Sequence, residues 1–454
     1  MNNRPYAAVM VAIALFIVWQ GPLPLKMYGQ SGIDYSEFKK KLEPYFADEL
    51  VEDITTAMPQ GASFKIWGYD VGDFSGDGIN DVAVSVNVLG TRRRESIVYL
   101  FIDNEGFLVN VAKFPLTYVD LPLEVGVAMR DGACYVTQKL KADHWLIKGY
   151  QYREGALVLL DEFVSDKVDS YGHESYVNYT TLESRERFLD AKGVEVAKAD
   201  YLNLPAYSRG RQIVAGYRDD IIVDRIRNVH DGAFWWSGPD DASFTGKVVY
   251  DDDYLYLRVD VRDSSVITGR CDSCAADRLD VWFDITPPDS VTGSRRIGRD
   301  DRGKLMFRGV SDSGLYALSI RIGDFEDVRP SVRVRTTDEL TESQQEAVQR
   351  IRVVTTLRST GYVVKVRVPF LLFGYERVPL DDRLVTEMGC TIALYDVDNE
   401  FRGDEVSVIA TSAINTLQPG TYGAIRFIPD ELWYGETTNI FADAVLSYLR
   451  ELGF

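Results

Sequence analysis

Short segments in which apolar side chains alternate with polar or small ones recur along most of this chain. Between Val82 and Val88 every second residue is valine, and Leu279 to Ile285 shows the same alternation. A period of two places the apolar side chains of a segment on one face of a β-strand. We therefore predict a mainly β protein, with an N-terminal antiparallel meander and a C-terminal β-sandwich.

Helical spacing is confined to a few segments. Apolar residues recur at three- and four-residue steps over residues 35–57 and 439–452, which predicts one amphipathic helix near each end. Short helices are also predicted at Thr341–Arg350 and near Leu182–Leu189. We divide the chain into a signal peptide or N-terminal anchor (1–30), a β domain with one helix (31–165), a connecting segment (166–215), a β-sandwich (216–430) and a C-terminal amphipathic helix (431–454).

The charge balance argues against a nucleic-acid partner. The chain has 50 Lys and Arg residues against 69 Asp and Glu residues, a formal net charge of −19. Phosphate backbones are bound by basic surfaces, and the basic run Arg92–Arg94 stands between two predicted strands, where a solvated turn is expected. An acidic surface suits divalent cations instead.

The N-terminus has the pattern of an export signal. Arg4 precedes an apolar run from Ala7 to Trp19, and Gly21 and Pro22 follow it. The run has 13 residues, fewer than the ~20 that a helix needs to cross a bilayer. We predict an exported protein, in the periplasm, on the cell surface or secreted. This segment is either a cleaved signal peptide, with cleavage near Gly29, or an uncleaved anchor that would be the chain's contact with a membrane.

One loop between two predicted strands has the pattern of a calcium site. Side-chain oxygens recur at alternate positions, and Gly78 follows the third of them. Calcium takes about six to eight oxygen ligands, and glycine permits the sharp turn that such a loop needs. The carbonyl oxygen of Ile79 would add a further ligand. The side chains concerned are those of Asp73, Ser75, Asp77 and Asp81.

The flanking strands exclude an EF-hand, whose twelfth position would here be Val84 instead of glutamate. The stretch Gly72–Asp81 reads Gly-Asp-Phe-Ser-Gly-Asp-Gly-Ile-Asn-Asp and resembles the calcium loop of integrin-type FG-GAP repeats. This resemblance implies a structural Ca²⁺. The alternative is an Asx-rich turn without an ion. The implied ligands are Asp73, Ser75, Asp77, Asp81 and the carbonyl of Ile79.

Several short motifs of the C-terminal half follow one another in the order of a known module. Taken together, residues 216–428 resemble the family 9 carbohydrate-binding modules. The resemblance implies a β-sandwich that binds a glycan between two tryptophans, but the corresponding stretches, Ser265–Ala275 and Thr411–Thr416, contain no Trp. The motifs are Asp231-Gly232 with Trp235 or Trp236, Tyr250–Leu257, Val261–Asp263, Asp277–Asp284, Gly361–Pro369, Tyr395–Asp398 and Tyr422-Gly423.

Sugar binding needs a flat aromatic face for the ring and polar side chains for the hydroxyls. Trp235 and Trp236 are candidates for the aromatic face, with packing in the core as the alternative. Four aspartates are candidates either for sugar hydroxyls or for a second calcium ion, with turn capping as the alternative. They are Asp263, Asp277, Asp396 and Asp398.

The four cysteines divide into two kinds. Cys271 and Cys274 form a C-x-x-C in a predicted loop, where an oxidising compartment favours a local disulfide. Cys134 and Cys390 lie within predicted strands, where we expect buried thiols.

No sequence motif of a nucleophile–base pair or a zinc hydrolase is present. We therefore predict an exported, non-catalytic, calcium-containing protein that binds a polysaccharide or other glycan. Two alternatives stay open: a scaffold that binds a protein partner instead of a sugar, and a glycoside hydrolase or its accessory protein with an acidic pair.

Overall fold

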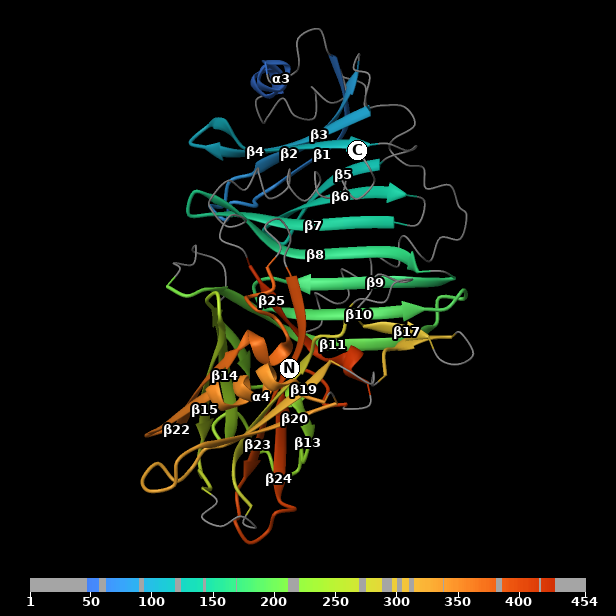
Figure 1. Ribbon diagram of the computed structural model, residues 1–454. Helices are drawn as coiled ribbons and strands as arrows, with labels where there is room; N and C mark the ends of the chain where they lie inside the picture. Colours follow the sequence, from blue (N-terminus) through green and yellow to red (C-terminus); the bar gives the residue numbers. More distant parts are fainter. Residues whose placement is uncertain are drawn as a thin grey trace. The chain divides into compact units, whose positions relative to one another are not determined.

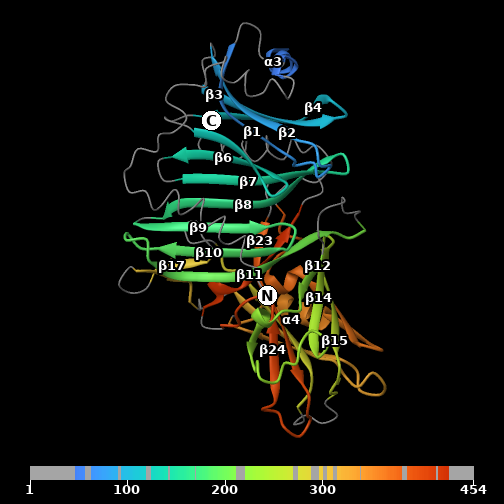
Figure 2. The same ribbon diagram turned by 180° about the vertical axis from the view of Figure 1, so that it is seen from behind.

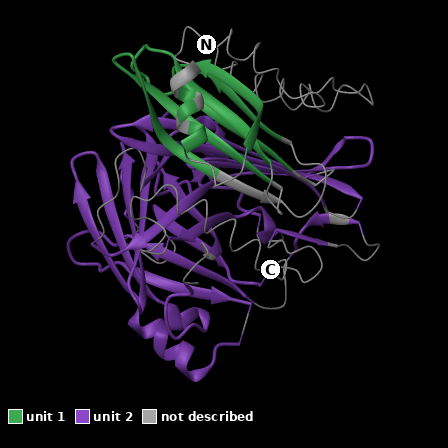
Figure 3. Ribbon diagram, turned by 90° about the horizontal axis from the view of Figure 1, so that it is seen from above, with its two compact units in different colours: residues 1–141 green, residues 142–454 purple. Residues whose placement is uncertain are grey.

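The chain forms two compact units, Met1–Lys141 and Ala142–Phe454 (Figure 3). The predicted boundary lies near residue 165 instead. The export signal, most of the helix over 35–57, the C-terminal helix, and Cys271 and Cys274 lie outside the described residues. The computed structural model describes residues 47–56, 63–89, 94–118, 124–141, 144–168, 170–210, 220–268, 275–287, 296–299, 304–309, 314–337, 339–380, 386–415 and 418–428.

The first unit is built on an antiparallel meander in which β1 to β4 pair in chain order, as predicted. The alternating valines of β2 meet Leu50 and Ile54 of α3, so this helix covers one face of the sheet. On the other face, the hydroxyl of Ser85 donates to the carbonyl of Val125 in β5 (3.4 Å). The elements are α3 (Ala47–Thr56), β1 (Ser63–Gly72), β2 (Asp81–Leu89), β3 (Arg94–Asn104), β4 (Phe107–Tyr118), β5 (Glu124–Arg130) and β6 (Ala133–Lys141).

The second unit begins with five strands, β7 to β11, each antiparallel to the next (Figures 1 and 2). The predicted helix near Leu182–Leu189 is wrong, because Glu183–Leu189 forms β10. Ser184, Glu186 and Phe188 are buried in alternation, which is the period of a strand. These strands are β7 (His144–Arg153), β8 (Ala156–Val168), β9 (Tyr171–Asn178), β10 and β11 (Glu195–Ser208).

Strand β11 joins the meander to the rest of the second unit. Its residues Asn203–Ala206 pair in parallel with Ala424–Phe427, and Ala206–Ser208 pair in parallel with Val248–Tyr250. Leu204 of β11 is buried in the core of the sandwich. The segment that the sequence suggests as a connection is therefore part of the sheet structure.

The remaining strands form a β-sandwich, as predicted. One sheet has the order β12–β14–β15–β22–β21, and the other runs β20–β19–β16–β23, with β24 and β25 paired to successive halves of β23 and β13 paired to β24. The strands are β12 (Asp220–Val223), β13 (Val229–Asp231), β14 (Ala242–Tyr250), β15 (Tyr254–Asp263), β16 (Arg278–Asp284), β19 (Leu315–Arg321), β20 (Ser331–Thr336), β21 (Arg352–Arg358), β22 (Gly361–Pro369), β23 (Thr386–Val397), β24 (Val406–Ala410) and β25 (Gly423–Phe427).

Short elements complete the unit. The predicted helix at Thr341–Arg350 is confirmed as α4, which Thr341 and Gln344 close with a reciprocal capping box. Neither helix of the described residues has the length and apolar character needed to cross a bilayer. The short elements are α4 (Glu342–Arg350), β17 (Ile297–Arg299), β18 (Leu305–Phe307), η2 (Ile226–Asn228), η3 (Phe370–Phe373) and η4 (Pro419–Thr421).

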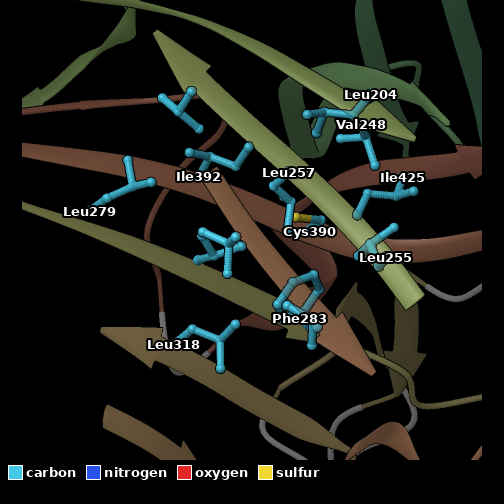
Figure 4. Packing of buried hydrophobic residues seen from close by; sticks show 14 of the residues in the cluster. Leu204, Val248, Leu255, Leu257, Leu279, Phe283, Leu318, Cys390, Ile392 and Ile425 are labelled. Atoms are coloured by element: carbon cyan, nitrogen blue, oxygen red, sulfur yellow. The ribbon is translucent and has the colours of Figure 1, made fainter. Parts of the chain in front are cut away.

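The core of the sandwich lies between its two sheets (Figure 4). Leu255 and Leu257 of β15 face Leu279 and Phe283 of β16 across this layer. Cys390 is buried among them, and Cys134 is buried in the first unit, so both predicted buried thiols are confirmed. This close-packed layer fixes the strand register and therefore where the strands end.

Candidate cation and ligand site

The strand register brings several loops to one end of the sandwich (Figure 1). Arg278 at the start of β16 lies opposite Tyr395 near the end of β23, and Asp231 at the end of β13 lies opposite Val408 of β24. Neighbouring antiparallel strands enter and leave a sheet at the same end. The loop 232–241, the described residues 264–268 and 275–277, and the loop 398–405 therefore lie at the same end of the sandwich.

A glycine permits the close approach of two of these loops. Gly232 has a φ of 64°, and a Cβ at this position would lie 1.9 Å from the carbonyl oxygen of Val406. Only a residue without a side chain fits there. The loop that carries Phe234 and Trp235 is thus held against the start of β24, beside the loop that carries Phe401.

Five aspartates gather at this end, which we call the acidic end. The carboxylate oxygens of Asp263, Asp277 and Asp396 lie within 4.8 Å of one another. Those of Asp241, Asp396 and Asp398 form a second such group, so Asp396 belongs to both. Asp277 and Asp396 are 1% and 2% exposed, whereas Asp398 is open to solvent. The structure thus brings together the four aspartates that the sequence suggests as ligands and adds Asp241.

Hydrogen bonds fix the aspartates to the loops around them. Asp277 accepts from the backbone N–H of Ile267 through Oδ2 (2.9 Å) and from that of Val397 through Oδ1 (3.0 Å). Asp263 accepts from the N–H of Ser265 (2.6 Å). These carboxylates therefore fix the backbone that follows β15 and the backbone at the end of β23.

Two buried oxygens at this end lack a hydrogen-bond partner among the described residues. They are Oδ1 of Asp396 and the hydroxyl of Tyr362. The pKa of Tyr362 is raised by burial and by the charges of Asp277, Asp263 and Asp396, so this hydroxyl lies in the field of the cluster. An unsatisfied buried oxygen costs about 1–3 kcal/mol, which a bound cation would offset.

Burial and mutual repulsion raise the pKa values of these carboxyls. Burial, followed by the charges of Asp263 and Asp398, raises the pKa of Asp396 to about 8. The pKa of Asp277 is also raised, by burial first and then by Asp263. Without a counter-charge the cluster therefore holds protons at neutral pH, and a cation would replace them.

The donor set consists of oxygen atoms, which hard divalent cations prefer. Ca²⁺ takes carboxylate and hydroxyl oxygens in flexible geometry, while softer transition metals favour nitrogen and sulfur. Among the described residues, both groups consist of aspartates and contain neither histidine nor cysteine. Asp263, Asp277, Asp396 and the hydroxyl of Tyr362 could hold such an ion, with Asp241 and Asp398 toward solvent.

The aromatic candidates of the same loops separate into two kinds. Trp236 packs against the core and donates its Nε1–H to the carbonyl of Ala242 (2.7 Å), which favours the packing alternative. Trp235 is 44% exposed, and Phe234 is fully exposed. Phe401, in the neighbouring loop, is 88% exposed. Sequence patterns did not single out Phe234 or Phe401, because only the fold shows that both loops leave at one end.

The predicted calcium loop of the first unit joins β1 to β2. Asp73 accepts from the N–H groups of Gly76 (2.6 Å) and Gly78 (2.9 Å), and Asp77 accepts from that of Ile79 (2.7 Å). Asp81 is buried, and one of its oxygens accepts from Phe74 and Ser75 while the other accepts from Asp103. The carboxylates thus shape the loop through its backbone, and calcium binding there stays a prediction.

Comparison with known proteins gives a weak likeness. No family model and no curated protein matches the chain. Two solved structures of a family 9 carbohydrate-binding module from Caldicellulosiruptor kristjanssonii, one with glucose and one with cellotriose, are similar over 50% of this chain and 96% and 94% of their own. Sequence identities are 14% and 15%, with a TM-score of 0.30 in both cases. The sandwich fold therefore rests on the strand pairing described above.

The raised pKa of Asp396 predicts how the folding stability depends on pH when a chelator keeps the protein free of metal ions. The folded protein holds this proton up to about pH 8, whereas an unfolded Asp releases it near its ordinary value of about 3.9. Stability should therefore fall as pH rises from 5 to 8. The Asp396→Asn variant, whose side chain cannot ionise, should lose less stability over this pH range.

Melting temperatures in EDTA measure the effect. Asp240→Asn, an exposed neighbour of the cluster, is the control and should follow wild type; identical slopes for all three proteins would contradict the assignment.

Proposed function

We propose that this chain is a non-catalytic, exported glycan-binding protein whose loops at the acidic end are held by calcium. The observation that carries the proposal is the exposure of Phe234, Trp235 and Phe401 on neighbouring loops above the buried aspartates. Solvent-exposed aromatic rings in fixed loops are unfavourable for solubility and are the surfaces on which sugar rings stack.

The loops are ordered by their own hydrogen bonds, as a preformed binding site requires. The N–H of Phe401 donates to Oδ1 of Asn399 (3.0 Å), and the N–H of Trp235 donates to the carbonyl of Gly232 (2.8 Å). A preformed site loses little conformational entropy when a ligand binds. Asp398, exposed on the same loop as Phe401, is the aspartate best placed to accept from sugar hydroxyls.

Calcium at the acidic end is supported by the shared carboxylates and the two buried oxygens without partners. A divalent cation would neutralise Asp263, Asp277 and Asp396 and thereby stiffen the loops that carry the aromatic rings. A second calcium ion in the loop Asp73–Asp81 of the first unit is supported by the spacing of its oxygen-bearing side chains.

Binding fits the acidic end better than hydrolysis does. A glycosidase needs two carboxyl groups that reach the scissile bond from both sides. Asp277 and Asp396 are buried, backbone N–H groups donate to both oxygens of Asp277, and the hydroxyl of Ser407 donates to Oδ2 of Asp396. We therefore assign these two aspartates to a structural role and sugar contact to the exposed loop residues.

Glycan binding should depend on the exposed rings. The named ligands of the two similar modules, glucose and cellotriose, are the first probes, followed by a glycan array. Trp235→Ala and Phe401→Ala should each weaken binding roughly two- to tenfold, because one stacked ring contributes about 0.5–1.5 kcal/mol. Calorimetry with the full chain measures this. Phe107→Ala, which removes an exposed ring from β4, is the matched control and should bind as wild type does. Absence of binding across the array would contradict the proposal and favour a protein-binding scaffold.

Calcium binding should show two independent sites. Titration of the chelator-treated protein by calorimetry should lose one site in Asp396→Asn and the other in Asp77→Ala, because the substitutions remove a ligand in different units. Asp240→Asn should keep both sites. Unchanged calcium binding by either variant would remove the corresponding ion from the proposal. Unchanged glycan affinity of the calcium-free protein would show that the aromatic loops do not depend on calcium.

A further inference from the structure

The outward face of one sheet of the sandwich is strongly basic, against the acidic composition of the chain. Along β14, β15, β22 and β21 the apolar side chains point to the core, and the alternate positions point outward. Lys and Arg are the commonest residues at these outward positions. We call this surface the basic face, and its cations are Lys247, Arg258, Arg262, Arg352, Arg358, Lys365 and Arg367.

The strand register places these cations directly beside one another. Arg258 of β15 lies opposite both Lys247 of β14 and Lys365 of β22, which makes a row of three cations across three strands. In the next row, Arg367 of β22 lies opposite Arg352 of β21. Like charges directly opposite each other in a sheet are destabilising. Such rows are unfavourable for folding unless carboxylates of the chain or a bound anion offset their charge.

Acidic side chains of the described residues offset only part of this charge. Asp260 pairs with Arg258 (2.6 Å) and with Arg358 (3.4 Å), so one carboxylate serves two cations. Asp220 lies opposite Lys247, and Asp240 pairs with Arg262 (2.9 Å). The guanidinium of Arg352 donates to the backbone carbonyls of Gln349 and Ile351 instead of a carboxylate. The basic face therefore keeps a net positive charge.

Arginine side chains also lie over the two tyrosines of this face. The guanidinium groups of Arg367 and Arg350 lie 4.5 and 5.4 Å from the ring centre of Tyr254, and that of Arg209 lies 5.0 Å from that of Tyr256. These contacts hold the long side chains in place, which lowers the entropy lost when an anion binds.

We propose that the basic face binds an anionic polysaccharide, one that carries sulfate or carboxylate groups along its length. Neighbouring strands are about 4.8 Å apart, so each row offers regularly spaced cations on a rigid, flat surface. A sugar polymer with a charge on successive residues presents anions at a comparable repeat. This site is distinct from the aromatic loops of the acidic end and does not depend on glycan binding there.

The chemistry of the face favours a polysaccharide over a protein partner. Arg and Tyr also occur at the centres of protein interfaces, but Lys is depleted there and the centre is built around buried aromatic and apolar side chains. Here Lys365 stands near the middle, the tyrosine rings face guanidinium groups, and Val354 is the exposed apolar residue of the outward positions of β21. A face of this kind binds through charge, which predicts a strong dependence on salt.

Binding of the full chain to immobilised dextran sulfate, with neutral dextran as the reference, tests the proposal. Wild type should bind dextran sulfate and not neutral dextran, and its affinity for dextran sulfate should fall as the salt concentration increases. A double variant that combines Lys365→Ser and Arg352→Ser should raise the Kd for dextran sulfate by roughly tenfold, because charged contacts of this kind give most of the affinity. Arg185→Ser, an exposed arginine of β10 that pairs with Asp200, is the matched control and should bind like wild type.

Several results would overturn the proposal. Equal binding by the double variant and wild type would show that the basic face is not the site. Equally tight binding of duplex DNA would show a nonspecific attraction for polyanions. A salt-sensitive dimer that the double variant abolishes, without binding to dextran sulfate, would assign the face to a second copy of the chain. Loss of dextran sulfate binding in Trp235→Ala would show that the two sites are not separate.

Discussion

Carboxylates buried side by side cannot all be ionised without a counter-charge, and this constraint governs the acidic end of the sandwich. Asp263, Asp277 and Asp396 come from three strand ends and share a space only a few ångströms wide. Asp263 and Asp277 also hold loops through hydrogen bonds, and Asp396 accepts from the hydroxyl of Ser407 in β24. Protons or a cation must therefore be present for these loops to keep their course. The exposed aromatic rings of the proposed glycan site lie on loops at this same end of the sandwich.

The cluster is a consequence of strand register. Close packing between the two sheets fixes which residue of β16 lies opposite which residue of β23, and thereby brings Asp277 beside Asp396. The same register aligns the cations of the basic face across β14, β15 and β22. A shift of one residue would exchange the core and outward positions of a strand. One packing constraint therefore positions both proposed binding surfaces.

The sequence predicts those elements whose period is clear. The valines of β2 and the alternation of β16 predict strands, and both strands are confirmed, although both faces of each strand are buried and not one face alone. Strand β10 is not predicted from the sequence because its charged residues suit the surface of a helix; its pairing with β9 and β11, which shows it to be a strand, is visible only in the structure. Asp277 and Asp396 can be suggested from motifs, but their burial cannot. The positions of Phe234, Phe401 and the cation rows of the basic face depend on which strands become neighbours, so no local sequence pattern predicts them.

Crystals of the full chain grown with calcium would test the central claim most directly. An anomalous difference map collected at a long wavelength reports calcium independently of any assumed ligand. A peak between the carboxylates of Asp263, Asp277 and Asp396 and near the hydroxyl of Tyr362 is the predicted result. Ordered loops at the acidic end with no anomalous peak there, at a calcium concentration that occupies other sites, would contradict it and would leave shared protons as the counter-charge.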